Sequence, residues 1–244
     1  MTVRTLRGGV VAASSVGLAL LVALIPAAGA NAADSPTCPK FNANAFHAPT
    51  TITNRYFPLT PGDVYTYKGF VQKETVDETV TVTRNTKKIA GVTTVEIHDQ
   101  VTTAGEPSED TLDWYAQDDA GNVWYFGEFA TDLPSGDHAG SWTAGVNGAK
   151  PGYIMQAAPD DDDPYCQENA RGVAQDAAEV VSLSASRSVP LGAFSDNILM
   201  TRDFSLIESG SEHKFYAPGV GLIEAIAING PKEDIKLVSR EQKA

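Results

Sequence analysis

The sequence predicts an all-β fold, a single antiparallel barrel or strongly curled sandwich of about 10–12 strands with one long Gly/Pro-rich loop. Three observations predict it. Beyond residue 32, β-branched and aromatic residues alternate with polar ones, and no long window keeps a helical period. Turn signals containing Gly or Pro recur about every 8–12 residues. The chain has 244 residues, of which 42% are hydrophobic, and this suits one large globular domain.

The first segment has the features of a secretory signal peptide, which we assign to residues 1–32. Arg4 and Arg7 are its only charges, and an apolar, small-residue run over residues 10–25 follows them. Two overlapping A-x-A sites end the segment, and we predict cleavage after Ala32. The run is short for a membrane-spanning helix, so a retained anchor is the weaker alternative. We therefore expect a secreted, extracellular protein with no membrane partner after cleavage.

The formal net charge is −13, and removal of the leader with its two arginines makes it −15. A surface of this charge repels nucleic acid and anionic lipid, which excludes both as partners. It suits a cationic or neutral ligand, although a well-solvated extracellular surface is the simpler explanation.

Both cysteines, Cys38 and Cys166, lie in the predicted mature chain. Outside the cytoplasm two cysteines form a disulfide more often than two free thiols. The bond would tie the N-terminal extension, residues 33–52, to the middle of the chain. A catalytic cysteine is the alternative, but no nucleophile motif surrounds either residue.

The β domain is assigned to residues 53–240. Its first strand follows the Pro61-Gly62-Asp63 turn, and Ala90-Gly91 and Ala104-Gly105 are further turn signals. Two aromatic strands are joined by Asp118-Asp119-Ala120-Gly121, and Pro218-Gly219 and Gly230-Pro231 separate the last strands. The expected strands cover residues 64–67, 74–83, 92–102, 111–117, 122–129, 153–156, 165–169, 179–188, 198–204, 212–217, 222–229 and 235–238.

Two segments are less regular. Residues 131–164 are rich in Gly and Pro, and we interpret them as a long irregular insertion over one mouth of the barrel. Residues 172–183 partly fit a helical period through their alanines, so a helix there stays open beside the strand.

The chain has no signature of a nucleotide, dinucleotide, zinc-protease or serine-hydrolase site, and we expect no cofactor and no metal. Asp160–Asp163 is a candidate calcium site, since hard cations bind carboxylates, but such runs are usually solvated. Asp118 to Asn122 also resembles a calcium loop in part. A hairpin turn with Gly121 at a positive φ explains that segment better.

The candidate ligand site combines aromatic and acidic residues. In the strand that follows Gly121, strict alternation puts Trp124, Phe126 and Glu128 on one face, where burial would raise the carboxyl pKa. Trp114, Glu168 and His213 would face the same interior. Polar groups that converge in an apolar pocket are typical of a ligand site, and satisfied structural partners are the alternative. The predicted ligand-binding residues are Trp114, Trp124, Phe126, Glu128, Glu168 and His213.

Four stretches resemble a widespread group of secreted bacterial proteins whose function is not characterised. They are T-N-R-Y-F-P-L at residues 53–59, D-W-Y-A-Q-D at 113–118, G-N-V-W-Y-F-G-E at 121–128 and H-K-F-Y-A-P-G-V-G at 213–221. The resemblance extends over most of residues 50–239. It implies a secreted single β domain and attaches no reaction. The two cysteines and the Asp160–Asp163 run depart from the group's pattern.

The favoured function is binding of an amphipathic small molecule or a glycan in an aromatic-lined barrel pocket. An extracellular hydrolase or lyase with Glu128 as general acid and Glu168 or His213 as its partner is the first alternative. A surface-interaction protein without a pocket is the second. The absence of a nucleophile motif favours binding over catalysis.

Overall fold

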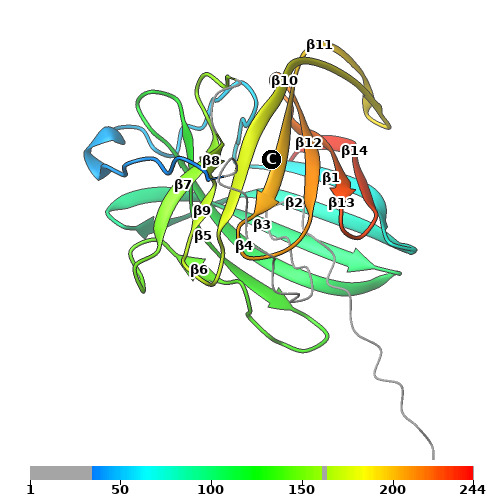
Figure 1. Ribbon diagram of the computed structural model, residues 1–244, viewed down its shortest axis with the longest axis horizontal. Coiled ribbons are helices and arrows are strands. Elements are labelled where there is room, and N and C mark those ends of the chain that lie inside the picture. The colour runs from blue at the N-terminus through cyan, green and yellow to red at the C-terminus, as the bar shows by residue number, and fades with distance from the viewer. Residues whose placement is uncertain (1–34, 161–163, 244) are drawn as a thin grey trace, which may run out of the picture.

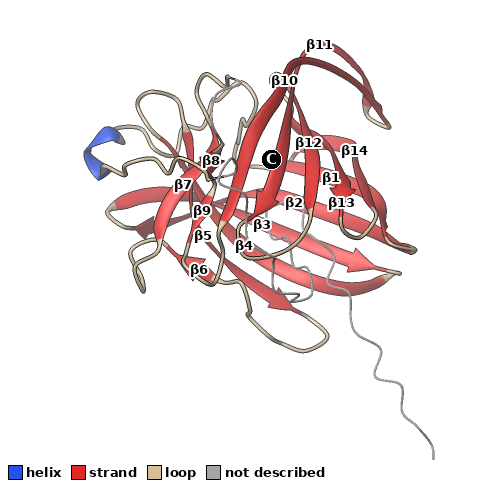
Figure 2. Ribbon diagram, viewed as in Figure 1, coloured by secondary structure: helices blue, strands red, loops and turns tan. Residues whose placement is uncertain are grey.

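The computed structural model describes residues 35–160 and 164–243 and confirms the predicted fold class. The described chain forms a nearly closed antiparallel barrel, seen obliquely in Figure 1. Within the described ranges strands dominate, and one short 3-10 turn, η2 (Ala43–Ala45), is the sole helical element (Figure 2). No helix in these ranges has the length and apolar character to span a bilayer. The predicted signal peptide lies outside the described residues, as does most of the Asp160–Asp163 run.

Most strands are long and are joined by tight turns. Their bounds are β1 (Asp63–Val71), β2 (Glu74–Ile89), β3 (Val92–Thr103), β4 (Glu106–Gln117), β5 (Val123–Asp132), β6 (Trp142–Thr143), β7 (Lys150–Met155), β8 (Tyr165–Cys166), β9 (Glu168–Asn169), β10 (Asp176–Val189), β11 (Gly192–Ser205), β12 (Ser211–Ala217), β13 (Gly221–Asn229) and β14 (Glu233–Gln242). Neighbours in the sheet follow the order β8-β10-β11-β12-β13-β14-β1-β2-β3-β4-β5-β7-β9, and β6 pairs with β5 beside this path.

Residues 165–169 bring the two edges of the sheet together. Cys166 in β8 pairs with Ala177 in β10, whereas Glu168 in β9, two residues later, pairs with Pro151 in β7. The chain therefore changes its hydrogen-bonding neighbour at Gln167, and the sheet has almost no free edge. Closure of this kind protects strand edges that would otherwise pair with other chains.

Gly152 lies at this junction. A Cβ atom there would collide with the main-chain carbonyl oxygens of Cys166 and Gln167, so only glycine lets β7 approach the switching segment this closely.

We therefore expect Gly152→Ala to lower the free energy of unfolding by about 1–3 kcal/mol through overpacking of backbone against backbone. Urea titration measures this loss. Gly192→Ala is the matched control, because a Cβ there meets nothing within 4 Å and it should change stability little. Equal stability of the two variants would contradict the tight junction.

The segments that the sequence left irregular contain strands. Residues 131–164 include β6 and β7, and β7 forms part of the barrel wall through its pairing with β5. The open choice at residues 172–183 is resolved as strand, since β10 begins at Asp176 and pairs along its length with β11.

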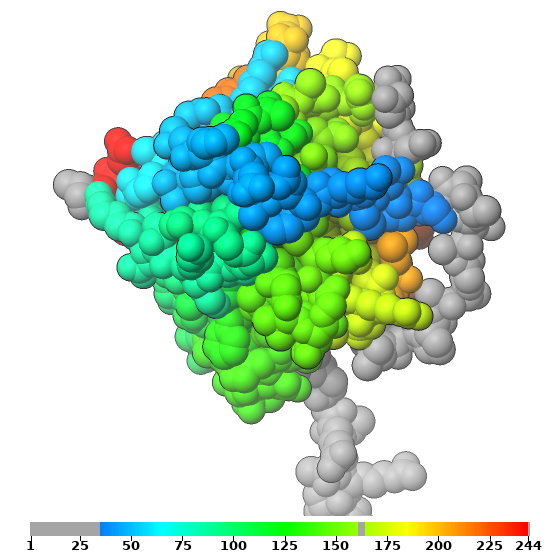
Figure 3. All heavy atoms as spheres, turned by 90° about the vertical axis from the view of Figure 1, so that its left-hand side faces the viewer, coloured from blue at the N-terminus to red at the C-terminus, as the bar shows by residue number. Residues whose placement is uncertain are grey.

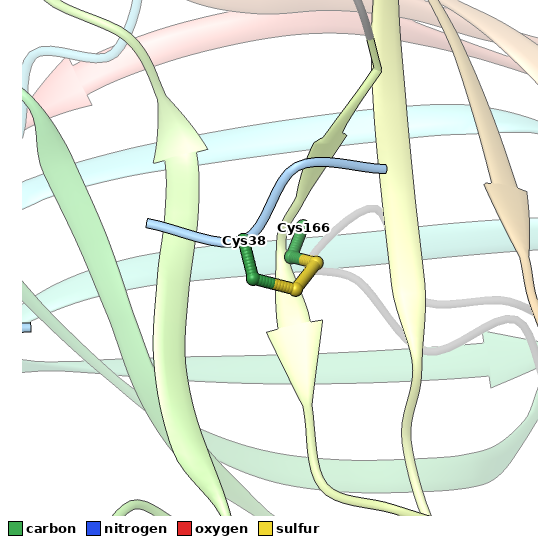
Figure 4. Close-up of a disulfide and its surroundings, with 2 residues drawn as sticks. All are labelled: Cys38 and Cys166. Atoms are coloured by element: carbon green, nitrogen blue, oxygen red, sulfur yellow. A yellow bond between two sulfur atoms is a disulfide. The ribbon is translucent and has the colours of Figure 1, made fainter. Parts of the chain in front are cut away.

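The N-terminal strap, residues 35–50, runs along the outside of the barrel, where Figure 3 shows it in blue across the surface. The predicted disulfide is confirmed: Cys38 bonds to Cys166 of β8 and so attaches the strap at the closing segment (Figure 4). Thr37 also forms a parallel bridge with Tyr165. The carbonyl oxygens of Ala45 and Pro49 accept hydrogen bonds from the amides of Asp119 and Gln117 at 2.8 and 2.9 Å, which fixes the far end of the strap.

Candidate functional site

A β-bulge in β5 decides which side chains reach the interior. Asp113 pairs with Glu128 and Tyr115 pairs with Tyr125, so Phe126 and Gly127 lie together opposite the single residue Trp114. Gly127 has a φ of 132°, which favours glycine, and a Cβ on it would collide with the Trp142 carbonyl oxygen in β6. Across the bulge the alternation shifts by one, and Tyr125 and Glu128 share a face.

The predicted common face of Trp124, Phe126 and Glu128 is therefore wrong. Trp124 and Phe126 contact Phe41 and Phe46 of the strap, with ring centroids 5.7–5.9 Å apart. These four rings form the strap contact on the outer side of the sheet. The Trp124 indole N–H donates to Asp118 Oδ2 at 2.8 Å. The strict alternation assumed from the sequence failed because the bulge adds one residue between Trp124 and Glu128.

The interior side of the bulge holds a pair of carboxyl groups that share one hydroxyl. Tyr125 Oη lies 2.6 Å from Asp113 Oδ1 and 3.1 Å from Glu128 Oε2, and all three side chains are buried. A tyrosine hydroxyl has one proton to donate, and the shorter contact gives that proton to Asp113. The Glu128 contact is satisfied best when Glu128 is protonated and itself donates to the tyrosine oxygen.

Glu168 joins this pair through Trp142. The Trp142 indole N–H donates to Glu168 Oε1 at 3.0 Å, and its ring meets the Tyr125 ring edge to face at 5.4 Å. Asp176, at the start of β10, adds a further acid whose charge acts on Glu168. We call Asp113, Glu128, Glu168 and Asp176 the acid cluster. Glu168 and Asp176 come from β9 and β10 at the closing segment, and Glu128 and Asp113 come from the neighbouring strands β5 and β4.

Burial makes every member of the acid cluster hard to ionise. It raises the pKa of Glu128 to about 8, and the Glu109 carboxylate adds to that rise. Burial followed by the charge of Glu128 raises the pKa of Asp113 well above its usual range. Burial and then Asp176 do the same for the pKa of Glu168. Burial also raises the pKa of Asp176 to about 7, against the opposing hydrogen bond of Ser205. At neutral pH the cluster therefore retains protons.

One buried carboxyl oxygen of the cluster has no hydrogen-bond partner in the described ranges. Asp113 Oδ2 has no hydrogen-bond partner within residues 35–160 and 164–243, and the Asp113 side chain is fully buried. Leaving such an atom unsatisfied costs about 1–3 kcal/mol, and a hydrogen bond formed there would recover that cost.

A second interior group surrounds Lys214, whose charge also acts on Asp176 of the acid cluster. Lys214 Nζ lies 3.1 Å from Glu212 Oε1 and 3.4 Å from Asp203 Oδ2. Asp203 Oδ2 also accepts a hydrogen bond from the Gln167 side chain at 3.1 Å. The two carboxylates raise the pKa of Lys214 against its burial. Lys214 is therefore a structural cation rather than a nucleophile.

The remaining predicted site residues lie apart from the acid cluster. Trp114 is covered by Lys87, whose Nζ is 3.2 Å from the ring centroid, and its N–H donates to Glu96 at 3.4 Å. His213 is partly exposed and pairs with Arg202 on the opposite face from Glu212 and Lys214. Partial burial and Arg187 lower the His213 pKa. Of the six predicted site residues, Glu128 and Glu168 are the two that lie in the acid cluster.

The Asp118 turn has the predicted hairpin form. Gly121 has a φ of 95°, and Asp118 Oδ1 accepts from the amides of Ala120 and Asn122 at 3.0 and 2.8 Å. Both Asp118 oxygens are thus used within the fold. Across the described ranges no group of three or more His, Cys, Asp or Glu side chains has a metal-binding arrangement.

Four members of the interior site were missed from the sequence: Asp113, Tyr125, Trp142 and Asp176. Gly127 was the available signal, because a glycine inside an aromatic strand often marks a bulge, and a bulge here aligns Tyr125 with Glu128. Trp142 lies in a strand of two residues, which is too short to show any alternation.

No family model matches the chain, and neither does any curated protein. Among solved structures, the chain is similar to a crystal structure from Bacteroides fragilis described as a "putative exported protein with YmcC-like fold". The two are 17% identical, the match covers 78% of this chain and 100% of that one, and the TM-score is 0.47. A likeness at this level says nothing about the site or function of this chain.

Proposed function

We propose that this is a secreted protein that binds a small amphipathic molecule inside the barrel, with the acid cluster holding the hydrogen-bond-donating part of the ligand. The observation that carries the proposal is the fully buried Asp113 carboxyl, whose Oδ2 lacks a donor in the described ranges. A ligand N–H or O–H would satisfy it and recover the cost of its burial. Small amphipathic molecules and short glycan segments both offer such donors.

The rings beside the cluster support the same proposal. Tyr115 stacks on Tyr125 with centroids 4.8 Å apart, and Trp142 lies edge-on to Tyr125. Aromatic rings next to a few polar groups are typical of small-molecule sites. In this proposal Tyr115, Tyr125 and Trp142 replace the strap-contact aromatics Trp124 and Phe126 as the apolar lining.

Thermal unfolding in the presence of a ligand panel tests the proposal. The panel contains primary and quaternary amines, mono- and oligosaccharides, and fatty acids. A ligand at a hundred times its dissociation constant adds about 2.7 kcal/mol to stability. We expect at least one member to raise the Tm of the wild type, and Asp113→Asn to reduce that rise.

Asp110→Asn is the matched control, since Asp110 is on the same strand but bonds to His98, 3.0 Å away on the outer face. It should keep the full Tm rise. No rise with any panel member would overturn the proposal and favour a protein that acts through its surface.

An acid–base enzyme is the second candidate, and one observation favours it. Glu128 has a pKa raised to about 8, and Asp113 is within reach of the same tyrosine hydroxyl. A carboxyl group that stays protonated near neutral pH, with a second carboxyl beside it, is typical of general acid–base catalysis. Turnover of a panel ligand, abolished by Glu128→Gln with binding retained, would identify an enzyme.

A further inference from the structure

The buried charges of the barrel are strongly unbalanced. Among the described residues eleven acidic side chains are buried, and Lys214 is the one buried basic side chain. Several of the acids have basic partners: Lys214 pairs with Asp203 and Glu212, and Arg240 lies 2.8 Å from Asp63. Asp113, Glu128 and Glu168 form no ion pair with a basic side chain in residues 35–160 and 164–243.

The groups around the acid cluster are mostly further acids and phenols, and one basic side chain, Lys214 of β12, acts on Asp176. The titratable groups that act on Glu128 are Asp99 from β3, Glu109 and Asp113 from β4, Tyr125 from β5, Glu168 from β9 and Asp176 from β10. Each carboxyl that ionises makes the next harder to ionise, because like charges at short range repel. A positive charge placed among them would remove that repulsion, whereas a neutral hydroxyl would not.

The rings match the same kind of ligand. The stacked Tyr115–Tyr125 pair and the Trp142 ring lie beside Asp113 and Glu168. Aromatic faces attract cations, and desolvated contacts of this type contribute up to about 2 kcal/mol. Carboxyl groups with adjoining aromatic rings are typical of ammonium recognition. The unsatisfied Asp113 Oδ2 supplies an acceptor for an ammonium N–H.

We propose that the ligand of this site is an amine, whose ammonium group binds between Asp113, Glu128 and the adjoining rings and displaces a proton from the acid cluster to solvent. The exchange balances: the protein loses one proton and gains one ammonium cation, and no covalent bond other than the carboxyl O–H is broken. This inference rests on the proposed function and narrows its ligand to one chemical class.

Proton displacement makes binding depend on pH. Below the pKa of the cluster the carboxyl must first lose its proton, so the affinity for an ammonium ion rises with pH. The pKa of Glu128 is about 8, so this rise in affinity extends across the neutral range. With one proton released, the dissociation constant falls about tenfold per pH unit between pH 6 and 7.

Isothermal titration calorimetry on the full chain tests the inference. The probes are 2-phenylethylamine, choline and spermidine, with 2-phenylethanol as the uncharged match of the first. We expect an amine to bind at least tenfold more tightly than the alcohol. Its heat should differ between phosphate and Tris at pH 7 by the ionisation heat of about one proton. Asp113→Asn should weaken binding at least tenfold and Asp110→Asn should not.

The variant Glu128→Gln distinguishes amine binding that displaces a carboxyl proton from amine binding through apolar packing alone. It should reduce proton release and flatten the pH dependence of amine binding, while the folded structure is retained. Failure of all three amines to bind overturns the amine inference, and so does binding without proton release. If a neutral sugar or lipid from the thermal panel binds instead, the proposed function stands and only the ligand class falls. If nothing binds in either experiment, both fall.

Discussion

Replacing Glu128 with glutamine is expected to stabilise the protein at pH 8 by up to about 4 kcal/mol and to leave its stability near pH 4.5 unchanged. The pKa of Glu128 is about 8 in the folded state, against an ordinary value of 4.5. The folded protein therefore holds a proton that the unfolded chain releases above pH 4.5. The stability that this proton contributes is complete below that pH and is lost as the pH rises through 8. Glutamine cannot ionise, so the variant escapes the loss.

Urea titrations at pH 5, 6, 7 and 8 measure the effect. Wild-type stability should fall across this range, and the fall should be shallower in Glu128→Gln. Glu106→Gln makes the same chemical change at the exposed start of β4 and should follow the wild type. A wild type that becomes more stable from pH 5 to 8, with Glu128→Gln running parallel to it, would refute the account of the acid cluster.

Removing the disulfide is expected to have the other large effect. Cys38 and Cys166 are 128 residues apart in sequence, so the bond restricts a long loop of the unfolded chain. We expect the double variant Cys38→Ser, Cys166→Ser to lose about 4–5 kcal/mol of stability on the chain-entropy account. Because the bond anchors the strap beside Trp124 and Phe126, a dye that binds exposed apolar surface should also bind more strongly to the variant.

Guanidinium unfolding of three samples checks this: the oxidised wild type, the wild type reduced with a thiol, and the double variant. The reduced wild type and the double variant should share a lower midpoint, which assigns the loss to the bond rather than to the serines. Unchanged midpoints and unchanged dye binding in both samples would show that the strap contact holds without the bond.

Much of the barrel was predictable because strand alternation and turn chemistry are local. The Pro61-Gly62-Asp63, Ala90-Gly91 and Ala104-Gly105 turns end or begin strands where the structure has them. The closing segment was not predictable in the same way. Residues 165–169 read as one strand, yet β8 pairs with β10 and β9 pairs with β7. Which neighbour a short strand takes depends on distant residues and leaves no local pattern.

The site was predicted in part, for a related reason. Glu128 was predicted as an acid on an aromatic strand and Glu168 as an acid in the strand next to Cys166. Both are buried, and the charge of Glu128 acts on Glu168. Tyr125 was missed because one inserted residue at Gly127 reverses which face of β5 looks inward. Asp113 was missed because the other face of its strand, which carries Trp114, was expected to look inward. The same reversal put Trp124 and Phe126 under the strap, whose contact with them joins residues more than 70 positions apart.

A carboxyl carbon NMR titration of glutamate-labelled protein, with and without 2-phenylethylamine, tests directly whether the interior acid cluster binds an amine. We predict one glutamate signal that titrates near pH 8, is absent in Glu128→Gln, and shifts toward the ionised form when the amine is added. If every glutamate carboxyl titrates below pH 6, or if the amine leaves that signal unchanged, the interior acid cluster is not the binding site.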